Sequence, residues 1–137
     1  MKRLLLIASI LAIPVFAIAN DAIDEAAKEE GAVKTTSGIV YIPIREGNGK
    51  SPRISDKVEV NYRGTLTNGS EFDKGKSITF PLSGVIHCWT LGLQYMKVGG
   101  KAKLVCPPEQ AYGSKGAGPY IPRNATLIFE VELLYIK

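Results

Sequence analysis

The stretch VEVNYRGTLTNGSEFD, residues 58–73, decides the fold because it holds a strand and the turn that reverses it. From Val58 to Arg63, apolar or aromatic residues alternate with charged or polar ones, the period-two pattern of a strand with one buried face. Asn68-Gly69 follows, and this dipeptide favours a tight hairpin turn. The stretch therefore predicts a hairpin in an antiparallel sheet that has one wet face.

Three other segments have strand patterns. Residues 101–106 and 127–134 alternate in the same way, so each is expected to bury one face. Residues 39–44 form a weaker candidate, in which Pro43 suggests an edge position because proline cannot donate a hydrogen bond to a neighbouring strand.

One helix is predicted among these strands, beginning near His87. Trp89, Leu93 and Met96 fall at i, i+4 and i+7 and form a single apolar stripe, and a Gly-Gly pair ends the segment. The expected fold class is therefore α+β, with an antiparallel sheet wrapped around one short amphipathic helix.

The only histidine of the chain, His87, stands beside Cys88. Adjacent side chains point to opposite faces of a strand and about 100° apart on a helix, so this thiol and imidazole do not form a catalytic pair. Zinc needs four ligands, and His87, Cys88 and Cys106 lack the close pair spacing of zinc sites. We therefore expect no metal site, and we expect His87 to face solvent.

Residues 1–19, MKRLLLIASILAIPVFAIA, have the layout of a secretory signal peptide, with Lys2 and Arg3 before an apolar run that ends in small residues. The alternative is an uncleaved anchor, but the run is shorter than the roughly 20 residues that span a bilayer. Cleavage after Ala19 would leave a periplasmic or secreted protein without a membrane span.

The remaining chain is expected to consist of two parts. Residues 20–36 begin with an Ala- and Glu-rich stretch that predicts a short exposed helix or a flexible segment, too short to be stable alone. Residues 37–137 are expected to form the folded domain.

Export also changes the interpretation of Cys88 and Cys106. An oxidising compartment would allow a disulfide between them, and a reducing one would leave two buried thiols. Both alternatives stay open, because the Cα separation decides between them.

The formal net charge is +4, which includes Lys2 and Arg3 of the predicted leader. The other basic residues are scattered along the chain, and we expect them to face solvent. A nucleic-acid partner is therefore not expected.

Four segments in order carry a family resemblance: residues 58–73, then VIHCWTLGLQYMKVGGK at 85–101, AYG at 111–113 and IPRNATLIFEVELL at 121–134. Together they resemble the FKBP family of macrolide-binding peptidyl-prolyl cis-trans isomerases, above all the exported bacterial members that are similar to macrophage infectivity potentiator proteins. The resemblance implies a five- or six-stranded antiparallel sheet around the helix, with a hydrophobic cleft between them. It implies no cofactor and no metal.

The resemblance also implies the residues of that cleft. Trp89 would be the floor on which a proline ring rests, and Asp73 would orient a neighbouring tyrosine at the cleft edge. Tyr112, through its hydroxyl, and Ile86, through its backbone N–H, would donate to carbonyls of the bound peptide. The catalytic set is Asp73, Tyr112 and Phe129, and the substrate-binding set is Tyr62, Phe72, Phe80, Val85, Ile86, Trp89, Tyr120 and Ile121. Taken singly, the apolar members would also suit the core of any α+β domain.

Three departures from the family pattern stand out. Cys88 replaces a usual glycine, and by resemblance its partner Cys106 lies on a strand, so a bridge from helix start to strand is expected. Residues 74–77 form a shorter connection than in many members, which bears on macrolide inhibition. The short N-terminal stretch lacks the heptads of a dimer seam, so a monomer is expected.

Two functions follow from the resemblance. The first is a prolyl isomerase that acts on proline-containing unfolded or partly folded exported proteins and that a macrolide could inhibit. The alternative is a periplasmic chaperone or peptide-binding module that uses the same cleft without significant turnover.

Overall fold

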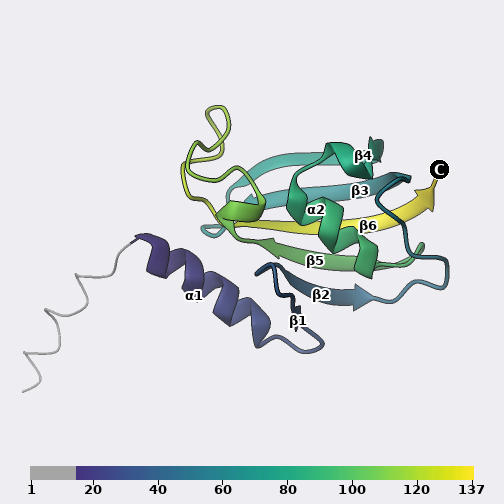
Figure 1. Ribbon diagram of the computed structural model, residues 1–137, viewed down its shortest axis with the longest axis horizontal. Coiled ribbons are helices and arrows are strands. Elements are labelled where there is room, and N and C mark those ends of the chain that lie inside the picture. Colours follow the sequence, from purple (N-terminus) through teal and green to yellow (C-terminus); the bar gives the residue numbers. More distant parts are fainter. Residues whose placement is uncertain (1–14) are drawn as a thin grey trace, which may run out of the picture.

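The computed structural model describes residues 15–137 and is built on a six-stranded antiparallel sheet (Figure 1). The order across the sheet is β1-β2-β5-β6-β3-β4. The predicted α+β class is confirmed. The strands are β1 (Val33–Lys34), β2 (Val40–Arg45), β3 (Lys57–Leu66), β4 (Glu71–Pro81), β5 (Lys101–Cys106) and β6 (Leu127–Ile136).

The predicted hairpin joins β3 to β4. Gly69 has a φ of 90°, which glycine adopts without steric cost, and the Asn68 side chain accepts the backbone N–H of Ser70 at 2.9 Å. Beyond the turn, β4 continues to Pro81, so residues 74–77 lie within a strand and not in the connection that the sequence suggested.

The predicted helix is α2 (His87–Gly92), which continues into a 3₁₀ turn at Leu93–Tyr95 and lies across one face of the sheet (Figure 1). Trp89 and Leu93 from its apolar stripe are buried against that face, and His87 is exposed as expected. A Cβ on Gly92 would lie 2.7 Å from a Leu104 methyl group, so the small residue lets α2 approach β5 closely.

The disulfide between Cys88 and Cys106 joins the first turn of α2 to the end of β5. The two Cα atoms are 5.7 Å apart, within the range that a disulfide spans, and both residues are fully buried. Of the two alternatives left open by the sequence, the structure has the disulfide, and the expected bridge from helix start to strand is confirmed.

We expect removal of this bridge to lower the free energy of unfolding by about 3 kcal/mol, because the cross-link restricts the unfolded chain. The test compares urea unfolding of the wild type, with and without reductant, to that of the double variant C88A/C106A. Reductant should lower the free energy of unfolding of the wild type but not that of the double variant. A titratable thiol in unreduced, denatured wild-type protein would contradict the bridge.

The weaker strand prediction at residues 39–44 corresponds to β2. β1 pairs with it only at Val40 and Tyr41, whereas β5 pairs along its length up to Arg45. The predicted edge position is therefore correct only for the second half of β2, where Pro43 lies beyond the reach of β1.

The N-terminal helix α1 (Val15–Ala27) packs against the face of the sheet that points away from α2. Ile23 and Ala26 are buried among Val40, Ile42 and Val105, which alternate with the residues that face α2. Of the two alternatives for residues 20–36, a short exposed helix or a flexible segment, the structure has a helix that ends at Ala27. This helix is docked and not exposed, because the sheet has an apolar patch on its second face. Residues 1–14 of the predicted leader lie outside the described part of the chain.

No helix among residues 15–137 is long and apolar enough to cross a membrane.

We expect Ile23→Ala to lower the free energy of unfolding by about 2–4 kcal/mol, because it leaves a cavity under α1. Glu25→Ala is the matched control on the same helix, since the Glu25 side chain is 75% exposed. Urea unfolding followed by circular dichroism measures both. Equal effects of the two substitutions would mean that α1 is not docked in solution.

Candidate functional site

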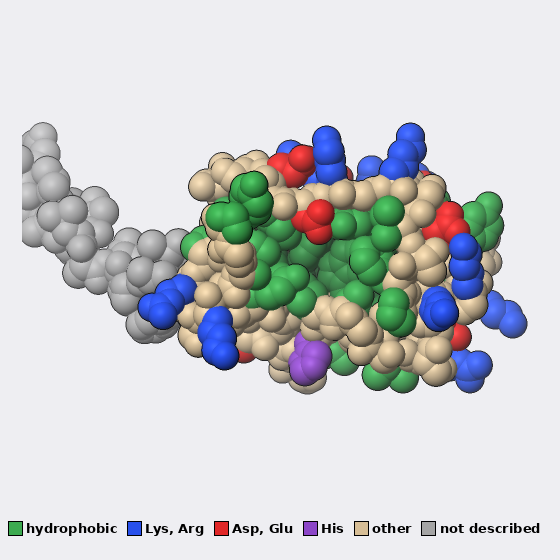
Figure 2. Space-filling model, turned by 90° about the horizontal axis from the view of Figure 1, so that it is seen from above, with side chains coloured by type: hydrophobic (Ala, Val, Ile, Leu, Met, Phe, Trp, Pro, Cys, Tyr) green, Lys and Arg blue, Asp and Glu red, His purple; other side chains and the backbone are tan. Residues whose placement is uncertain are grey.

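A cleft of about 540 Å³ opens between the sheet and the segment that leads into α2. Figure 2 shows an apolar hollow on this face of the molecule, with an acidic side chain at its rim. Its floor and walls come from β3, β4, β6, α2 and the chain after β5. The lining residues are Tyr62, Asp73, Phe80, Gly84, Val85, Ile86, Trp89, Ala111, Tyr112 and Phe129.

Trp89 lies at the centre of the aromatic residues in this cleft. Its ring makes edge-to-face contacts with Tyr62, Phe80 and Phe129, at centroid distances of 5.2, 5.5 and 5.4 Å. Three rings thus hold one indole from three sides, and Trp89 is only 4% exposed. The floor of the cleft is therefore part of the hydrophobic core.

The indole Nε1–H of Trp89 is buried and has no acceptor within the described part of the chain. An unpaired donor in a buried position costs free energy. Trp89 therefore carries one buried, unpaired donor beneath the cleft.

Asp73 and Tyr62 form the polar edge of the cleft. The Tyr62 hydroxyl donates to Asp73 Oδ2 at 2.9 Å, and Asp73 Oδ1 accepts the backbone N–H of Lys74 at 2.8 Å. Burial, with the hydrogen bond to Asp73, raises the pKa of Tyr62 to about 12. Asp73 is thus bonded to a tyrosine at the cleft edge, and its role in orienting that ring stays a prediction.

A β-bulge at Phe72 brings two adjacent residues to the cleft side. Gly64 pairs with Asp73 and Thr65 with Glu71, so Phe72 is an extra residue on β4. Phe72 packs edge-to-face on Phe129 at 5.5 Å, while Asp73 reaches Tyr62.

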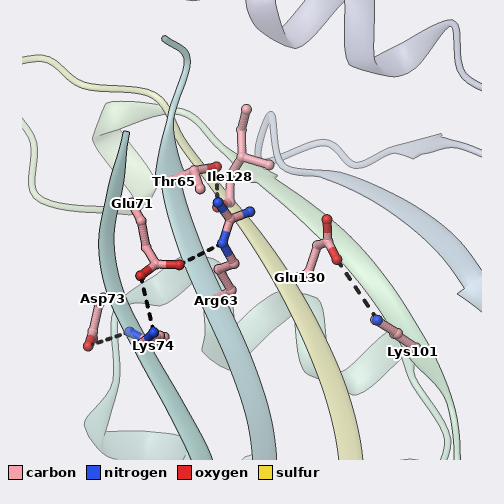
Figure 3. Close-up of polar contacts among 8 residues, drawn as sticks. All are labelled: Arg63, Thr65, Glu71, Asp73, Lys74, Lys101, Ile128 and Glu130. Atoms are coloured by element: carbon pink, nitrogen blue, oxygen red, sulfur yellow. Dashed lines mark hydrogen bonds and ion pairs between the residues drawn. The ribbon is translucent and has the colours of Figure 1, made fainter. Parts of the chain in front are cut away.

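The opposite face of β3 and β4 is charged (Figure 3). Glu71 accepts from Arg63 at 2.6 Å and lies 3.8 Å from the ammonium of Lys74. Further along this face, Lys101 pairs with Glu130 at 3.9 Å. The sheet thus separates an apolar cleft from a polar outer surface.

Most of the residues predicted from the sequence meet in the cleft: Tyr62, Asp73, Phe80, Val85, Ile86, Trp89, Tyr112 and Phe129. Phe72 stands behind Phe129 and supports the wall. Ile121 is 8% exposed and packs in the core cluster that also contains Trp89 and Phe129, and Tyr120 is 69% exposed; neither is among the residues that line this cleft, and their substrate-binding role stays a prediction. Gly84 and Ala111 were missed, because small residues carry no chemical signal in the sequence.

No group of histidine, cysteine or acidic side chains within residues 15–137 could hold a metal ion.

Because the pKa of Tyr62 is raised, the free energy of unfolding should vary with pH in the alkaline range. Free tyrosine ionises near pH 10, so between about pH 10 and 12 the unfolded chain has lost a proton that folded Tyr62 keeps. The contribution of this group to stability is therefore complete below pH 10 and is lost as the pH rises through about 12.

Spectrophotometric titration of tyrosinate tests this prediction. Tyr62→Phe should remove a component that titrates near pH 12, whereas Tyr135→Phe, at a site that is 61% exposed, should leave that component in place. An identical titration of the wild type and Tyr62→Phe in this pH range would refute the assignment.

Comparison with known proteins places this geometry among prolyl isomerases. A family model described as FKBP-type peptidyl-prolyl cis-trans isomerase matches residues 48–134. The FKBP-type peptidyl-prolyl cis-trans isomerase FkpA of Escherichia coli is 51% identical over 115 residues, which cover 81% of this chain and 42% of that protein. The FKBP-type 22 kDa peptidyl-prolyl cis-trans isomerase of the same organism is 45% identical over 118 residues, 83% of this chain and 57% of that protein.

Solved structures give the same result. The crystal structure of FkpA from Escherichia coli superposes with a TM-score of 0.84 at 48% identity, over 88% of this chain and 58% of that chain. The crystal structure of a peptidyl-prolyl cis-trans isomerase from Pseudomonas syringae pv. tomato superposes with a TM-score of 0.83 at 34% identity, over 92% of this chain and 98% of that chain. The chain spans less than half the length of the FkpA sequence that it matches.

Proposed function

This chain belongs to the FKBP-type peptidyl-prolyl cis-trans isomerase family, and on that premise we propose that it catalyses rotation about X-Pro peptide bonds in its aromatic cleft. The observation that carries the proposal is the buried indole of Trp89, walled by Tyr62, Phe80 and Phe129 and edged by Asp73. Its proposed substrates are proline-containing segments of unfolded or partly folded polypeptides.

The chemistry needs no nucleophile. Without a catalyst an X-Pro bond isomerises in roughly 10–100 s, against a barrier near 20 kcal/mol. At the twisted transition state the C–N bond loses its resonance, so the amide is less polar than in the planar ground state. An apolar cleft therefore favours the transition state, and contacts with neighbouring substrate residues help to hold the twist.

Each cleft residue has a proposed role. The proline ring would rest on Trp89, between the walls made by Tyr62 and Phe129. The Tyr112 hydroxyl and the backbone N–H of Ile86 would donate to carbonyl oxygens of the substrate and hold its backbone on either side of the rotating bond. Asp73 would keep the Tyr62 ring in place through their hydrogen bond of 2.9 Å. A rate gain of about 10⁴ needs roughly 5.4 kcal/mol, which desolvation and a few hydrogen bonds can supply.

The protein is further proposed to be exported to the periplasm or beyond, and to act as a monomer that a macrolide can inhibit. Two features support export: residues 1–19 have the pattern of a signal peptide, and Cys88 and Cys106 are joined in a disulfide, which persists in oxidising compartments.

A second candidate function is chaperone-like binding of unfolded chains without significant turnover. It is supported by two exposed rings that follow β5: Tyr112, which lines the cleft, is 41% exposed, and Tyr120 is 69% exposed. Such rings can contact apolar segments whether or not a proline occupies the floor.

A protease-coupled assay with a Leu-Pro tetrapeptide tests the isomerase. We expect macrolide-sensitive acceleration by residues 20–137 and a drop in kcat/KM of about 10- to 100-fold in Asp73→Leu, because loss of a hydrogen bond to a charged group costs roughly 1.5–3 kcal/mol. Asp24→Leu is the matched control, as Asp24 is on α1 and pairs with Lys34.

The same variants separate the two candidate functions. If the protein is an isomerase, the variants Asp73→Leu and Phe129→Tyr should lose turnover of the tetrapeptide while they still suppress the aggregation of unfolded proteins. If folded wild-type protein does not accelerate isomerisation, the isomerase proposal is refuted and the binding function remains.

A further inference from the structure

β4 has a second bulge, directly opposite Asn61. Val60 pairs with Ile78 and Tyr62 with Gly75, so Asn61 alone faces two residues of β4. One of these, Ser77, has a φ of 54°, in the left-handed region that residues with a side chain seldom adopt. Asn61 Oδ1 accepts the backbone N–H of Ser77 at 2.8 Å, and this hydrogen bond holds the bulge in place.

Asn61 is itself anchored on the outer face of the sheet. Its Nδ2 donates to Glu132 Oε1 at 3.1 Å, and Arg45 donates to Glu132 Oε2 at 2.7 Å and to the Gly99 carbonyl at 3.1 Å. The hydrogen bond from Asn61, together with that from Arg45, lowers the pKa of Glu132 from its ordinary value. The ionised carboxylate therefore stays a strong acceptor, and the network connects β4, β3, β6 and β2.

Asn61 and Glu132 line a groove of about 660 Å³ on this outer face, together with Lys101 and Glu130. Figure 3 shows the ion pair between Glu130 on β6 and Lys101 on β5. Among residues 15–137, no hydrogen bond or ion pair joins Lys101 or Glu130 to Asn61 or Ser77, although the charge of Lys101 also helps to lower the pKa of Glu132. Glu130 therefore offers a neighbouring site for comparison.

The bulge bears directly on the cleft wall. A Cβ on Gly75 would lie 2.6 Å from Cε1 of Tyr62, so the backbone of β4 rests on the Tyr62 ring. Two residues earlier on the same strand, Asp73 accepts the Tyr62 hydroxyl at 2.9 Å. The strand therefore touches Tyr62 at its ring and at its hydroxyl, and a slip of the bulge would move both contacts.

We propose that Asn61 is a positioning residue for the cleft: by holding the Ser77 N–H from the outer face, it sets the place of β4 against Tyr62. This role rests on the proposed isomerase function, because its consequence is the position of a cleft wall. It assigns a catalytic effect to a side chain on the opposite face of the sheet from the substrate.

Four variants test the role. Asn61→Leu removes both hydrogen bonds of the side chain. Asn61→Asp keeps an acceptor for Ser77 but sets a second carboxylate against Glu132, and the double variant N61D/E132Q exchanges amide and carboxylate and rebuilds the network. Glu130→Gln is the matched control, on the same strand and face as Glu132.

Two readouts are needed: kcat and KM on the Leu-Pro tetrapeptide, and the indole N–H resonance of Trp89 in a ¹⁵N-correlated NMR spectrum. The chain has one tryptophan, so this resonance is unambiguous, and Trp89 contacts the Tyr62 ring at 5.2 Å. We expect Asn61→Leu to lower kcat/KM about tenfold, which corresponds to about 1.4 kcal/mol, and to shift the resonance, because the Tyr62 wall loses its fixed position. N61D/E132Q should restore both readouts towards wild type, and Glu130→Gln should change neither.

A loss of thermal stability in Asn61→Leu with unchanged kcat/KM and an unchanged Trp89 resonance would overturn the positioning role. Should Asn61→Leu fail to fold, the comparison of Asn61→Asp with N61D/E132Q decides in its place, and absence of rescue counts against the proposal. If the wild type shows no turnover, the isomerase function fails, and the Trp89 resonance alone decides whether Asn61 positions the Tyr62 wall.

Discussion

The packing of Trp89 against three aromatic rings is the interaction on which both the core and the cleft depend. The helix that carries it, α2, spans only His87–Gly92 and is too short to be stable in isolation. It is held by the burial of Trp89 and Leu93 and by the disulfide from Cys88 to β5. The cleft floor is therefore as rigid as the core, because the same side chain serves both.

A rigid, apolar floor suits a reaction in which no covalent bond is made or broken. In the proposed isomerase, substrate would lose its hydration against Trp89 without a rearrangement of the protein, so that binding energy would go into the geometry of the rotating bond. The polar side chains Asp73 and Tyr62 lie at the edge, where they bond to each other. The two faces of the sheet differ in character. One face bears the apolar cleft, and the outer face carries solvated ion pairs such as that between Arg63 and Glu71.

The irregularities of β4 connect the two faces. In a regular strand Phe72 and Asp73 would point to opposite sides, and the bulge at Phe72 allows both to serve the cleft. The bulge at Ser77 is held from the outer face by Asn61, while Gly75 lets the strand rest on Tyr62. An edge strand with two bulges also presents a poor template for pairing with another chain.

Local patterns determined much of this protein before any tertiary contact was considered. The alternation in β3, β5 and β6, the Asn68-Gly69 turn and the apolar stripe from Trp89 to Met96 are visible in the sequence, because burial on one face imposes its own period on strand and helix. The cleft residues were implied by the family resemblance, which rests on the joint order of several motifs. No single one of them would have identified the cleft.

Tertiary structure alone decided the features that depend on distance. The sequence left the pairing of Cys88 with Cys106 open because the 5.7 Å between their Cα atoms is set by how α2 docks on β5. The docking of Ile23, and the burial of Ile121 in the core cluster, follow from surfaces that distant segments build together. The bulges of β4 also depend on tertiary structure. A register shift arises between two paired strands, so the sequence pattern of one strand does not reveal it.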